Sequence, residues 1–325
     1  MTNSPPGRIG TCVLVLVLLG ACVPFSASST PTPAPLAAQT AAAGSLAPGA
    51  TPKALVPDFT HIVIVMFENK AFGSVIGNPL MPGFNKLARE HTLLTQYYAI
   101  GRPSLPNYIG LISGGTYGID TNCAECFVDA VSMPDLIEAS GRTWRTYQED
   151  MPERCFLGDA APYAQKHNPF IYFDPIRLDE ARCRKSIVPL DRLQVDIKGD
   201  SLPNFIFISP NLCNDSHDCS LDVTDAWLAE LLDGLLPALD AAPQPYLLVL
   251  MFDEDEGEGA CCGPPPEAGG RVPVILYSPL ARSGFEDATP YNHYSLLKTI
   301  STAWGLPLLG HAADDTNTLI TEPWK

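Results

Sequence analysis

Residues 61–77, HIVIVMFENKAFGSVIG, decide how this chain folds. Isoleucine and valine alternate over 62–65, and an apolar run of this kind is typical of a buried parallel strand. The run ends abruptly at Glu68 and Asn69. Ligands of open α/β sheets bind beyond the carboxyl ends of strands, so this pair would suit a hard divalent cation or a phosphate-handling site. The alternative is that one of the two side chains only caps the next helix.

The rest of the chain alternates between strand-like and helix-like segments. Further apolar strands are predicted at 93–100, 143–147, 204–209, 246–252 and 272–277. Helices are predicted at 80–90, 104–114, 133–140, 224–236 (ended by Pro237) and 291–304. Strands that are apolar on both faces and separated by helices predict an α/β fold, with a mostly parallel central sheet and helices on both faces. The cysteine-rich, irregular segment at about 115–200 is expected to form an inserted cap.

Residues 1–21 have the features of an export signal. Arg8 is the only charged side chain before an apolar core at 12–20, which is too short to cross a bilayer. The sequence LGAC, ending at Cys22, is similar to the lipobox of bacterial lipoproteins and makes Cys22 the expected lipidation site. The alternative is an ordinary secretory signal cleaved nearby. We therefore expect an exported protein, either a cell-surface lipoprotein or a secreted one.

Composition defines a tether, a domain and a charge. Residues 22–56 are almost entirely Pro, Ala, Ser, Thr and Gly, which predicts an extended tether, and 57–325 would form one large domain. The 20 basic and 36 acidic residues give a net charge of −16. Such a field repels nucleic acid and anionic membranes, so membrane contact is expected only through an N-terminal lipid anchor. No sequence feature indicates an oligomeric state.

Eight cysteines lie beyond the signal. An even number in an exported chain predicts up to four disulfides, one of which would pin a loop between Cys213 and Cys219. The alternative is a zinc–thiolate site built from a Cys-x-x-Cys pair and a vicinal pair. The eight are Cys123, Cys126, Cys155, Cys183, Cys213, Cys219, Cys261 and Cys262.

Ser104 is a candidate nucleophile. It lies between two prolines at the predicted start of a helix, where free N–H groups favour an anion. The sequence has no G-x-S-x-G elbow, so coordination to a metal is the other route to activation. A serine that only caps the helix is the alternative.

An acidic run, DEDEG, follows the strand predicted at 246–252. Adjacent carboxylates repel one another unless a cation lies among them, so Asp253 and Glu254 are predicted metal ligands. The later carboxylates are expected to be solvated; they are Asp255, Glu256 and Glu258.

Two histidines lie where they would reach a substrate. His217, next to Asp218, follows the strand at 204–209, and His293 starts the last helix. The alternatives are a surface loop and a helix cap.

In this order, these segments resemble the bacterial phosphoesterase family that contains secreted acid phosphatases and non-haemolytic phospholipases C, within the alkaline phosphatase superfamily. The resemblance covers about 57–310 and implies an exported, metal-dependent phosphatase that hydrolyses phosphomonoesters. The matching pieces are the strand with its Glu-Asn pair at 61–69, PSLPNY at 103–108, PNLCNDSHDC at 210–219, FDED at 252–255, GGRVPVILYSP at 269–279 and NHYSLLKTI at 292–300.

The resemblance implies a mechanism. Ser104 would attack phosphorus beside one or more divalent metal ions and give a phosphoserine that water hydrolyses. His217 and His293 would contact the phosphoryl oxygens or protonate the leaving group. Oxygen ligands favour Mg, Ca or Mn, with Zn as a further alternative. The implied ligands are Glu68, Asn69, Ser104, Asp253 and Glu254.

The resemblance also implies substrate contacts. Asn107 and Arg102 would bind the phosphate, and Asp218 would orient a histidine. Many relatives carry a histidine where this chain has Arg102. The arginine adds a bidentate phosphate donor but removes a titratable group. The chain lacks the long C-terminal extension of the phospholipase C members, which favours small phosphomonoesters or exposed lipid head groups, phosphoinositides included. The alternatives are a phospholipase C-type phosphodiesterase and a substrate-binding lipoprotein.

Overall fold

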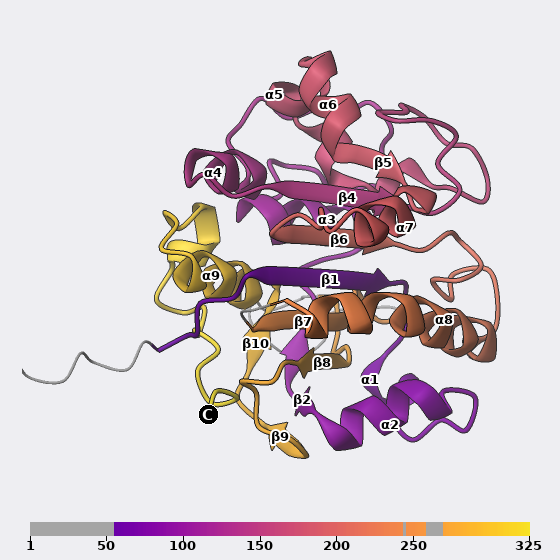
Figure 1. The fold of residues 1–325 in the computed structure, drawn as a ribbon, viewed down its shortest axis with the longest axis vertical. Helices are drawn as coiled ribbons and strands as arrows, with labels where there is room; N and C mark the ends of the chain where they lie inside the picture. Colours follow the sequence, from indigo (N-terminus) through magenta and orange to yellow (C-terminus); the bar gives the residue numbers. More distant parts are fainter. Residues whose placement is uncertain (1–54, 243–244, 258–268) are drawn as a thin grey trace, which may run out of the picture. The chain divides into compact units, whose positions relative to one another are not determined.

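The central sheet is built around β1 (His61–Phe67). β6 (Phe205–Ser209) pairs with one side of β1 and β7 (Tyr246–Phe252) with the other, both in parallel. The computed structural model describes residues 55–242, 245–257 and 269–325. Within these residues the sheet has eight strands in the order β5-β4-β6-β1-β7-β8-β2-β9 (Figure 1). The predicted α/β fold with a mostly parallel sheet is confirmed.

The outer strands differ between the two edges. Beyond β6 the sheet continues in parallel through β4 (Trp144–Gln148) and β5 (Ile187–Pro189). Beyond β7, the strand β8 runs antiparallel to both of its neighbours. The strands of this second edge are β8 (Val274–Tyr277), β2 (Thr92–Leu94) and β9 (Phe285–Asp287).

The strand predicted at 93–100 is wrong in extent. The segment forms two short strands, β2 in the main sheet and β3 (Tyr97–Tyr98) in a second sheet, where β3 pairs in parallel with β10 (Tyr291–Asn292). Thr95 lies at the break and donates its backbone N–H to Asp287 O, at 2.8 Å. Its partner strand therefore changes along the segment, which an apolar pattern alone does not reveal.

The helices pack in two groups. One contains α3 (Ser104–Ser113), α4 (Met133–Ala139) and α9 (His293–Ala303); the other contains α2 (Pro82–Glu90), α7 (Asp191–Lys198) and α8 (Leu221–Asp240), which crosses in front of the strands in Figure 1. The shorter elements are α1 (Phe72–Val75), η1 (Gln165–His167), η2 (Pro169–Tyr172), α5 (Asp174–Arg177), α6 (Glu180–Ser186) and η3 (Gly310–Ala313). Across the described ranges, no helix combines the length and apolar character that a membrane span needs.

α8 continues through Pro237 to Asp240, so the prediction that Pro237 ends this helix is wrong. A proline removes one helical hydrogen bond because it has no N–H. Here it lies in the last turn, and its own carbonyl still accepts the N–H of Ala241 at 3.2 Å. Leu235 and Leu239, on either side of it, are buried in the core and hold the turn in place.

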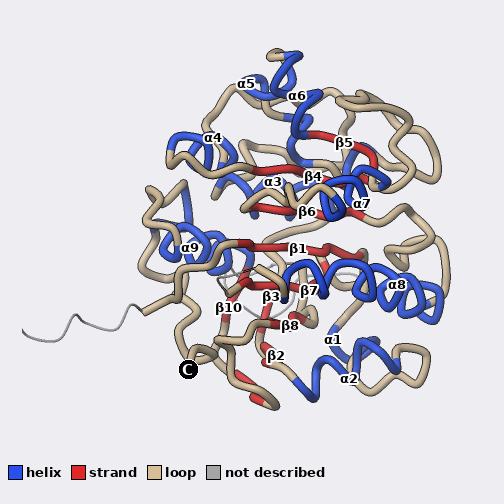
Figure 2. The backbone as a smooth tube through the Cα atoms, viewed as in Figure 1, coloured by secondary structure: helices blue, strands red, loops and turns tan. Residues whose placement is uncertain are grey.

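The segment at 115–200 divides between the sheet and irregular structure (Figure 2). Its strands β4 and β5 belong to the main sheet, so only the remainder, short helices and long loops, lies outside the sheet as a cap would. Two disulfides, Cys123–Cys126 and Cys155–Cys183, lie in this segment.

The third disulfide, Cys213–Cys219, closes the loop after β6, as predicted. Because Cys123 is bonded to Cys126, the zinc–thiolate alternative fails at that pair. The predictions on the signal, on the vicinal cysteines, on Glu258 and on most of the tether concern residues outside the described ranges, namely 1–54, Glu258, Cys261 and Cys262. Of the predicted tether, residues 55 and 56 are described, and Val56 is buried in the core of the domain.

Candidate active site

Three parallel strands deliver polar residues to one edge of the sheet. Phe67, at the end of β1, pairs with Phe252, at the end of β7, so the chain continues into Glu68 and Asp253 at the same level. The N–H of Asn69 donates to Asp253 Oδ1 at 2.9 Å and ties the two strand ends together. Asn69 has a φ of 52°, a left-handed conformation that asparagine adopts more readily than most residues. The predicted pairing of these two strand ends is therefore present.

Glu68 is fully buried and lies at the centre of the site. Its Oε2 accepts hydrogen bonds from Ser104 Oγ at 2.8 Å and Asn69 Nδ2 at 2.9 Å. Its Oε1 accepts one from the Tyr108 hydroxyl at 2.5 Å, and His167 Nε2 lies 3.1 Å from Oε2. Burial raises the pKa of Glu68, but the charge and hydrogen bond of His167 outweigh it and lower the pKa to about 2. Glu68 is therefore ionised, and the hydroxyl of Ser104 is directed at it.

His167 is a site residue that the sequence analysis missed. It lies in η1, buried, with Nδ1 3.2 Å from Asp215 Oδ2, so its ring bridges Asp215 and Glu68. The ring stacks on Tyr108, with centroids 5.4 Å apart. Burial lowers the pKa of His167, but the two carboxylates raise it to about 9. The imidazolium thus joins the β1 edge to the disulfide-closed loop after β6.

No sequence pattern points to His167. It lies in the irregular segment, and no predicted strand ends directly before it. Asp215 carried a weak signal, because it falls within the matching piece at 210–219.

Ser104 is the first residue of α3 and is 1 % exposed. A helix of ten residues begins at this point, and the positive end of its dipole favours an anion. The N–H of Leu105 donates to Asn122 Oδ1 at 3.0 Å. At the other end, Gly114 has a φ of 77°, and a Cβ there would meet the carbonyl of Leu309 at 2.0 Å. Glycine is therefore required where the helix stops.

Asn107 is turned toward the backbone instead of an open space. Its Oδ1 accepts the N–H groups of Ile100 and Gly101 at 3.0 and 3.1 Å. Its Nδ2 donates to Gly101 O at 2.9 Å and to Glu254 Oε2 at 3.2 Å. These contacts fix the loop before α3 and do not support the predicted contact between Asn107 and phosphate.

Asp253 and Glu254 form an acidic centre with Glu68. Asp253 is fully buried, and among the described residues its Oδ2 has no hydrogen-bond partner. Burial and the charges of Glu68 and Glu254 raise the pKa of Asp253 well above its usual value. Burial and Glu68 likewise raise the pKa of Glu254 to about 8, against the positive charge of Arg102. These are the surroundings that a bound cation would neutralise.

The acidic centre is not gathered as a closed metal cage. In the ranges that the structure describes, no group of three His, Cys, Asp or Glu side chains converges closely enough to hold a metal ion by itself. The predicted ligand set combines three carboxylates with an amide and a hydroxyl, and the structure brings all five to the same edge of the sheet.

His293 begins α9 and is fully buried. Its Nε2 is 2.7 Å from the backbone oxygen of Asp253, and its Nδ1 is 3.2 Å from the Tyr97 hydroxyl. Burial lowers the pKa of His293 to about 4, so the ring is neutral and Nε2 donates to the carbonyl. This placement does not support the predicted contact with phosphoryl oxygens. The ring instead holds the backbone that presents Asp253.

His217 lies beside Asp218, as predicted. Its Nδ1 is 2.6 Å from Asp218 Oδ1, and its side chain is 34 % exposed. Both residues line a cavity of about 360 Å³. Of the two predicted histidines, His217 is the one that faces an open space.

Arg102 forms an ion pair with Asp255, and its Nη2 donates to Gly269 O at 3.3 Å. The prediction that Asp255 is solvated is wrong, because its side chain is 14 % exposed and paired with this guanidinium. Glu256 is more exposed and lies 3.4 Å from Lys70 Nζ. The acidic run therefore continues beyond the strand as two ion pairs.

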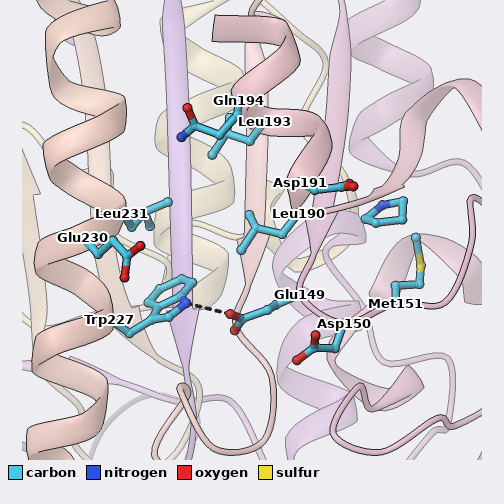
Figure 3. A pocket seen from close by; sticks show the side chains of 11 residues that line it. Glu149, Asp150, Met151, Leu190, Asp191, Leu193, Gln194, Trp227, Glu230 and Leu231 are labelled. Carbon is cyan, nitrogen blue, oxygen red and sulfur yellow. Dashed lines mark hydrogen bonds between the residues drawn. The ribbon is translucent and has the colours of Figure 1, made fainter.

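A second cavity, of about 490 Å³, lies between α7 and α8 (Figure 3). On its wall, Glu149 accepts the indole N–H of Trp227 at 2.9 Å. The same carboxylate accepts the backbone N–H of Asn211 at 2.8 Å and Asn214 Nδ2 at 2.9 Å. Glu149 thus anchors the loop that carries Asp215. None of the candidate catalytic residues lines this cavity.

Comparison with known sequences identifies the family. Residues 78–307 match the model of the Phosphoesterase family. The chain is 34 % identical to the phosphate-repressible acid phosphatase of Penicillium chrysogenum, over 86 % of this chain and 67 % of that protein. It is 32 % identical to the phosphatidylinositol-3-phosphatase of Mycobacterium tuberculosis, over 83 % and 84 % respectively. The non-hemolytic phospholipase C of Pseudomonas aeruginosa is 25 % identical over 53 % of this chain and 29 % of its own length.

Solved structures agree at the level of the fold. A protein of the alkaline phosphatase superfamily from Vibrio parahaemolyticus has a TM-score of 0.55 at 14 % identity, with 80 % of this chain and 71 % of that one covered. Human ectonucleotide pyrophosphatase/phosphodiesterase 5 has a TM-score of 0.56 at 11 % identity, with 82 % and 100 % covered. The chain therefore belongs to the phosphoesterase family and is an enzyme that hydrolyses phosphoric esters.

Proposed function

We propose that the protein is an exported, metal-dependent phosphatase that cleaves phosphomonoesters with Ser104 as its nucleophile. The observation that carries this proposal is the 2.8 Å hydrogen bond from Ser104 Oγ to ionised Glu68, at the start of a buried helix and beside two further carboxylates. Two relatives at 34 % and 32 % identity are named as phosphatases, which supports the same reaction class.

The acidic centre fits a divalent cation because Asp253 Oδ2 is buried without a partner among the described residues. The residues that would hold the ion are Glu68, Asn69, Ser104, Asp253 and Glu254. A bound cation lowers the pKa of a coordinated hydroxyl and screens the phosphate dianion. Oxygen donors of this kind favour Mg, Ca or Mn, with Zn as the softer alternative.

The chemistry of the chain's own residues follows from their positions. Ser104 Oγ passes its proton to Glu68 Oε2, 2.8 Å away, and forms a bond to phosphorus while the bond from phosphorus to the leaving oxygen breaks. His217, held by Asp218, gives its proton to that oxygen. The positive end of the α3 dipole and the guanidinium of Arg102 attract the phosphoryl oxygens. Water then attacks phosphorus and gives a proton to His217, the bond from Ser104 Oγ to phosphorus breaks as Oγ regains its proton, and phosphate leaves.

Export and substrate are part of the same proposal. Three disulfides in the described residues are typical of an oxidising compartment, which supports an export signal at 1–21. Lipidation at Cys22 is proposed from the LGAC sequence alone. A phosphoinositide head group is a candidate substrate, because the 32 % identical relative is named phosphatidylinositol-3-phosphatase.

The test is phosphate release from p-nitrophenyl phosphate, with and without chelator. Ser104→Ala is expected to lower kcat by about 10³-fold or more, because no nucleophile remains. Ser113→Ala is the matched control; this serine belongs to the same buried helix, but its hydroxyl contacts backbone oxygens, Ile109 O at 2.7 Å and Gly115 O at 3.0 Å. Retention of more than a few per cent of the rate by Ser104→Ala would exclude Ser104 as the nucleophile. Release of phosphocholine from a phospholipid would instead indicate the phospholipase C alternative.

A further inference from the structure

The cavity of about 360 Å³ adjoins the proposed nucleophile. Asn122, on its wall, accepts the N–H of Leu105, the residue directly after Ser104. His217, on another wall, has its ring 6.2 Å from that of His167. A group bonded to a phosphoryl at Ser104 would therefore have this cavity within reach.

Lys166 places a positive charge on the wall of this cavity. Its side chain is half-buried, and its Nζ is 3.3 Å from Nε2 of His217. With Nδ1 donating to Asp218, the neutral ring accepts from the ammonium at Nε2, whereas the imidazolium that acts as the acid in the proposed reaction carries its own proton there. In the described part of the chain, Lys166 forms no ion pair with a carboxylate, although the protein carries a net charge of −16. Its remaining protons are free to bind an anion in the cavity.

The acidic groups of the same cavity are already engaged. Asp218 contacts the ring of His217, and Asp159 Oδ1 accepts the N–H of Gln165 at 2.8 Å. The charge of Lys166 acts on Glu68 and Glu254 only from a longer distance, because no carboxylate of the described residues lies within ion-pair distance of its Nζ. An anion in the cavity can therefore bind the ammonium directly.

We propose that Lys166 binds a second anionic group on the leaving part of the substrate, so that the enzyme prefers phosphomonoesters whose leaving group is itself anionic. This inference rests on the proposed function for the identity of the reacting group. It makes Lys166 a specificity-determining residue that the catalytic cluster does not include.

The test compares fructose 6-phosphate with fructose 1,6-bisphosphate, which differ only in the second phosphate. Wild-type enzyme is expected to show a kcat/KM for the bisphosphate at least about tenfold higher, since a charge-assisted hydrogen bond contributes that much. Lys166→Met should bring the ratio of kcat/KM for the bisphosphate to kcat/KM for the monophosphate close to two, the statistical value for two reactive phosphates. Lys166→Arg should keep most of the wild-type preference for the bisphosphate. Lys198→Met, at an exposed lysine ending α7, is the matched control and should not change the ratio.

The inference is overturned if Lys166→Met leaves the ratio of the two kcat/KM values unchanged. That result includes an equal fall in kcat/KM for both substrates, which is expected of a residue that binds the reacting phosphate. Calorimetry in the Ser104→Ala background separates this inference from the proposed function. Tighter binding of the bisphosphate that depends on Lys166 would support the inference even if the wild type hydrolysed neither sugar. Equal binding of the two sugars would refute it.

Discussion

Asp196 and Asp253 are both fully buried carboxylates, but they differ in the charge and the hydrogen bonds of the groups around them. Asp196, in α7, contacts the guanidinium of Arg145 and accepts from the Tyr147 hydroxyl at 2.7 Å and Arg192 Nε at 2.9 Å. Burial raises the pKa of Asp196, but these partners outweigh it and lower the pKa. The charge is fully compensated within the protein.

Asp253 directly follows β7, and its surroundings raise its pKa where those of Asp196 lower it. Its Oδ1 accepts one backbone N–H, its Oδ2 has no partner among the described residues, and the nearest charges are the carboxylates of Glu68 and Glu254. A buried charge with cationic partners holds a fold together, whereas one without them costs stability. The contrast indicates that Asp196 is retained for structure and Asp253 for function.

The sharpest test of this contrast is Asp253→Asn. We expect kcat/KM for p-nitrophenyl phosphate to fall by about 10³-fold, because the variant loses a charged ligand of the proposed cation. In chelator, its melting temperature should equal or exceed that of the wild type, since an uncompensated buried charge is removed. Adding Mn²⁺ or Mg²⁺ should stabilise the wild type more than the variant, as differential scanning fluorimetry would show. Full activity with an unaltered metal requirement would refute the assignment.

Asp196→Asn should do the reverse. We expect the free energy of unfolding to fall by about 3 kcal/mol, because Arg145 and Arg192 are left without their carboxylate, while the activity at low temperature changes little. The folded pKa of Asp196 is lowered, so its contribution is present above the unfolded value and is lost as pH falls through the folded pKa. The stability gap between wild type and variant, measured by urea unfolding, should therefore be constant from neutral pH down to about 5 and narrow at more acidic pH. A gap that widens on acidification would contradict this account.

The disulfides extend the same comparison. Removing Cys155–Cys183 by a double serine substitution should cost about 2–3 kcal/mol of stability, because it frees a loop of 28 residues. Cys213–Cys219 closes only 6 residues, so its removal should cost less stability but more activity, since its loop carries Asp215. Thermal melts and kinetics of the two double variants measure both effects. A larger loss of activity on removing Cys155–Cys183 than on removing Cys213–Cys219 would contradict the assignment of the first disulfide to stability and the second to the site.

Glu149→Gln is the mildest change that we propose. The amide keeps the shape of the side chain but loses the charge that accepts from Asn211, Asn214 and Trp227. We expect kcat to fall by about tenfold with a smaller change in KM, because the loop that positions His167 is loosened. Glu230→Gln, on the same cavity, is the matched control. An equal fall in kcat for Glu149→Gln and Glu230→Gln would mean that the loss comes from removing a charge on the cavity wall and not from the hydrogen bonds of Glu149 to the loop.

The parts of the site that follow strands were predictable. Glu68 and Asp253 come directly after apolar runs, and parallel strands bring their carboxyl ends to one edge, so a local pattern places both. The disulfide of the loop at 213–219 was likewise predictable from the export context. Ser104 was predictable only as a helix start beside prolines, and the matching segments gave it a role.

The parts that depend on packing were not predictable. His167 lies about a hundred residues from Glu68, in a segment without periodicity, and only the fold brings its ring between Glu68 and Asp215. His293 and Asn107 were predicted to contact phosphate, and that stays a prediction. The structure adds that His293 contacts the backbone of Asp253 and that Asn107 contacts Gly101 O and Glu254 Oε2, which no local pattern indicates.

The sequence by itself determined the α/β architecture, the positions of its main strands along the chain and the edge at which the carboxylates gather. These features depend on which residues are apolar and where each apolar run stops, and both are local properties of the chain. Only the tertiary structure decided that Asp255 is paired and that Lys166 faces a cavity without a carboxylate partner among the described residues. A side chain's charge and hydrogen bonds depend on neighbours distant in sequence, and packing alone selects those neighbours.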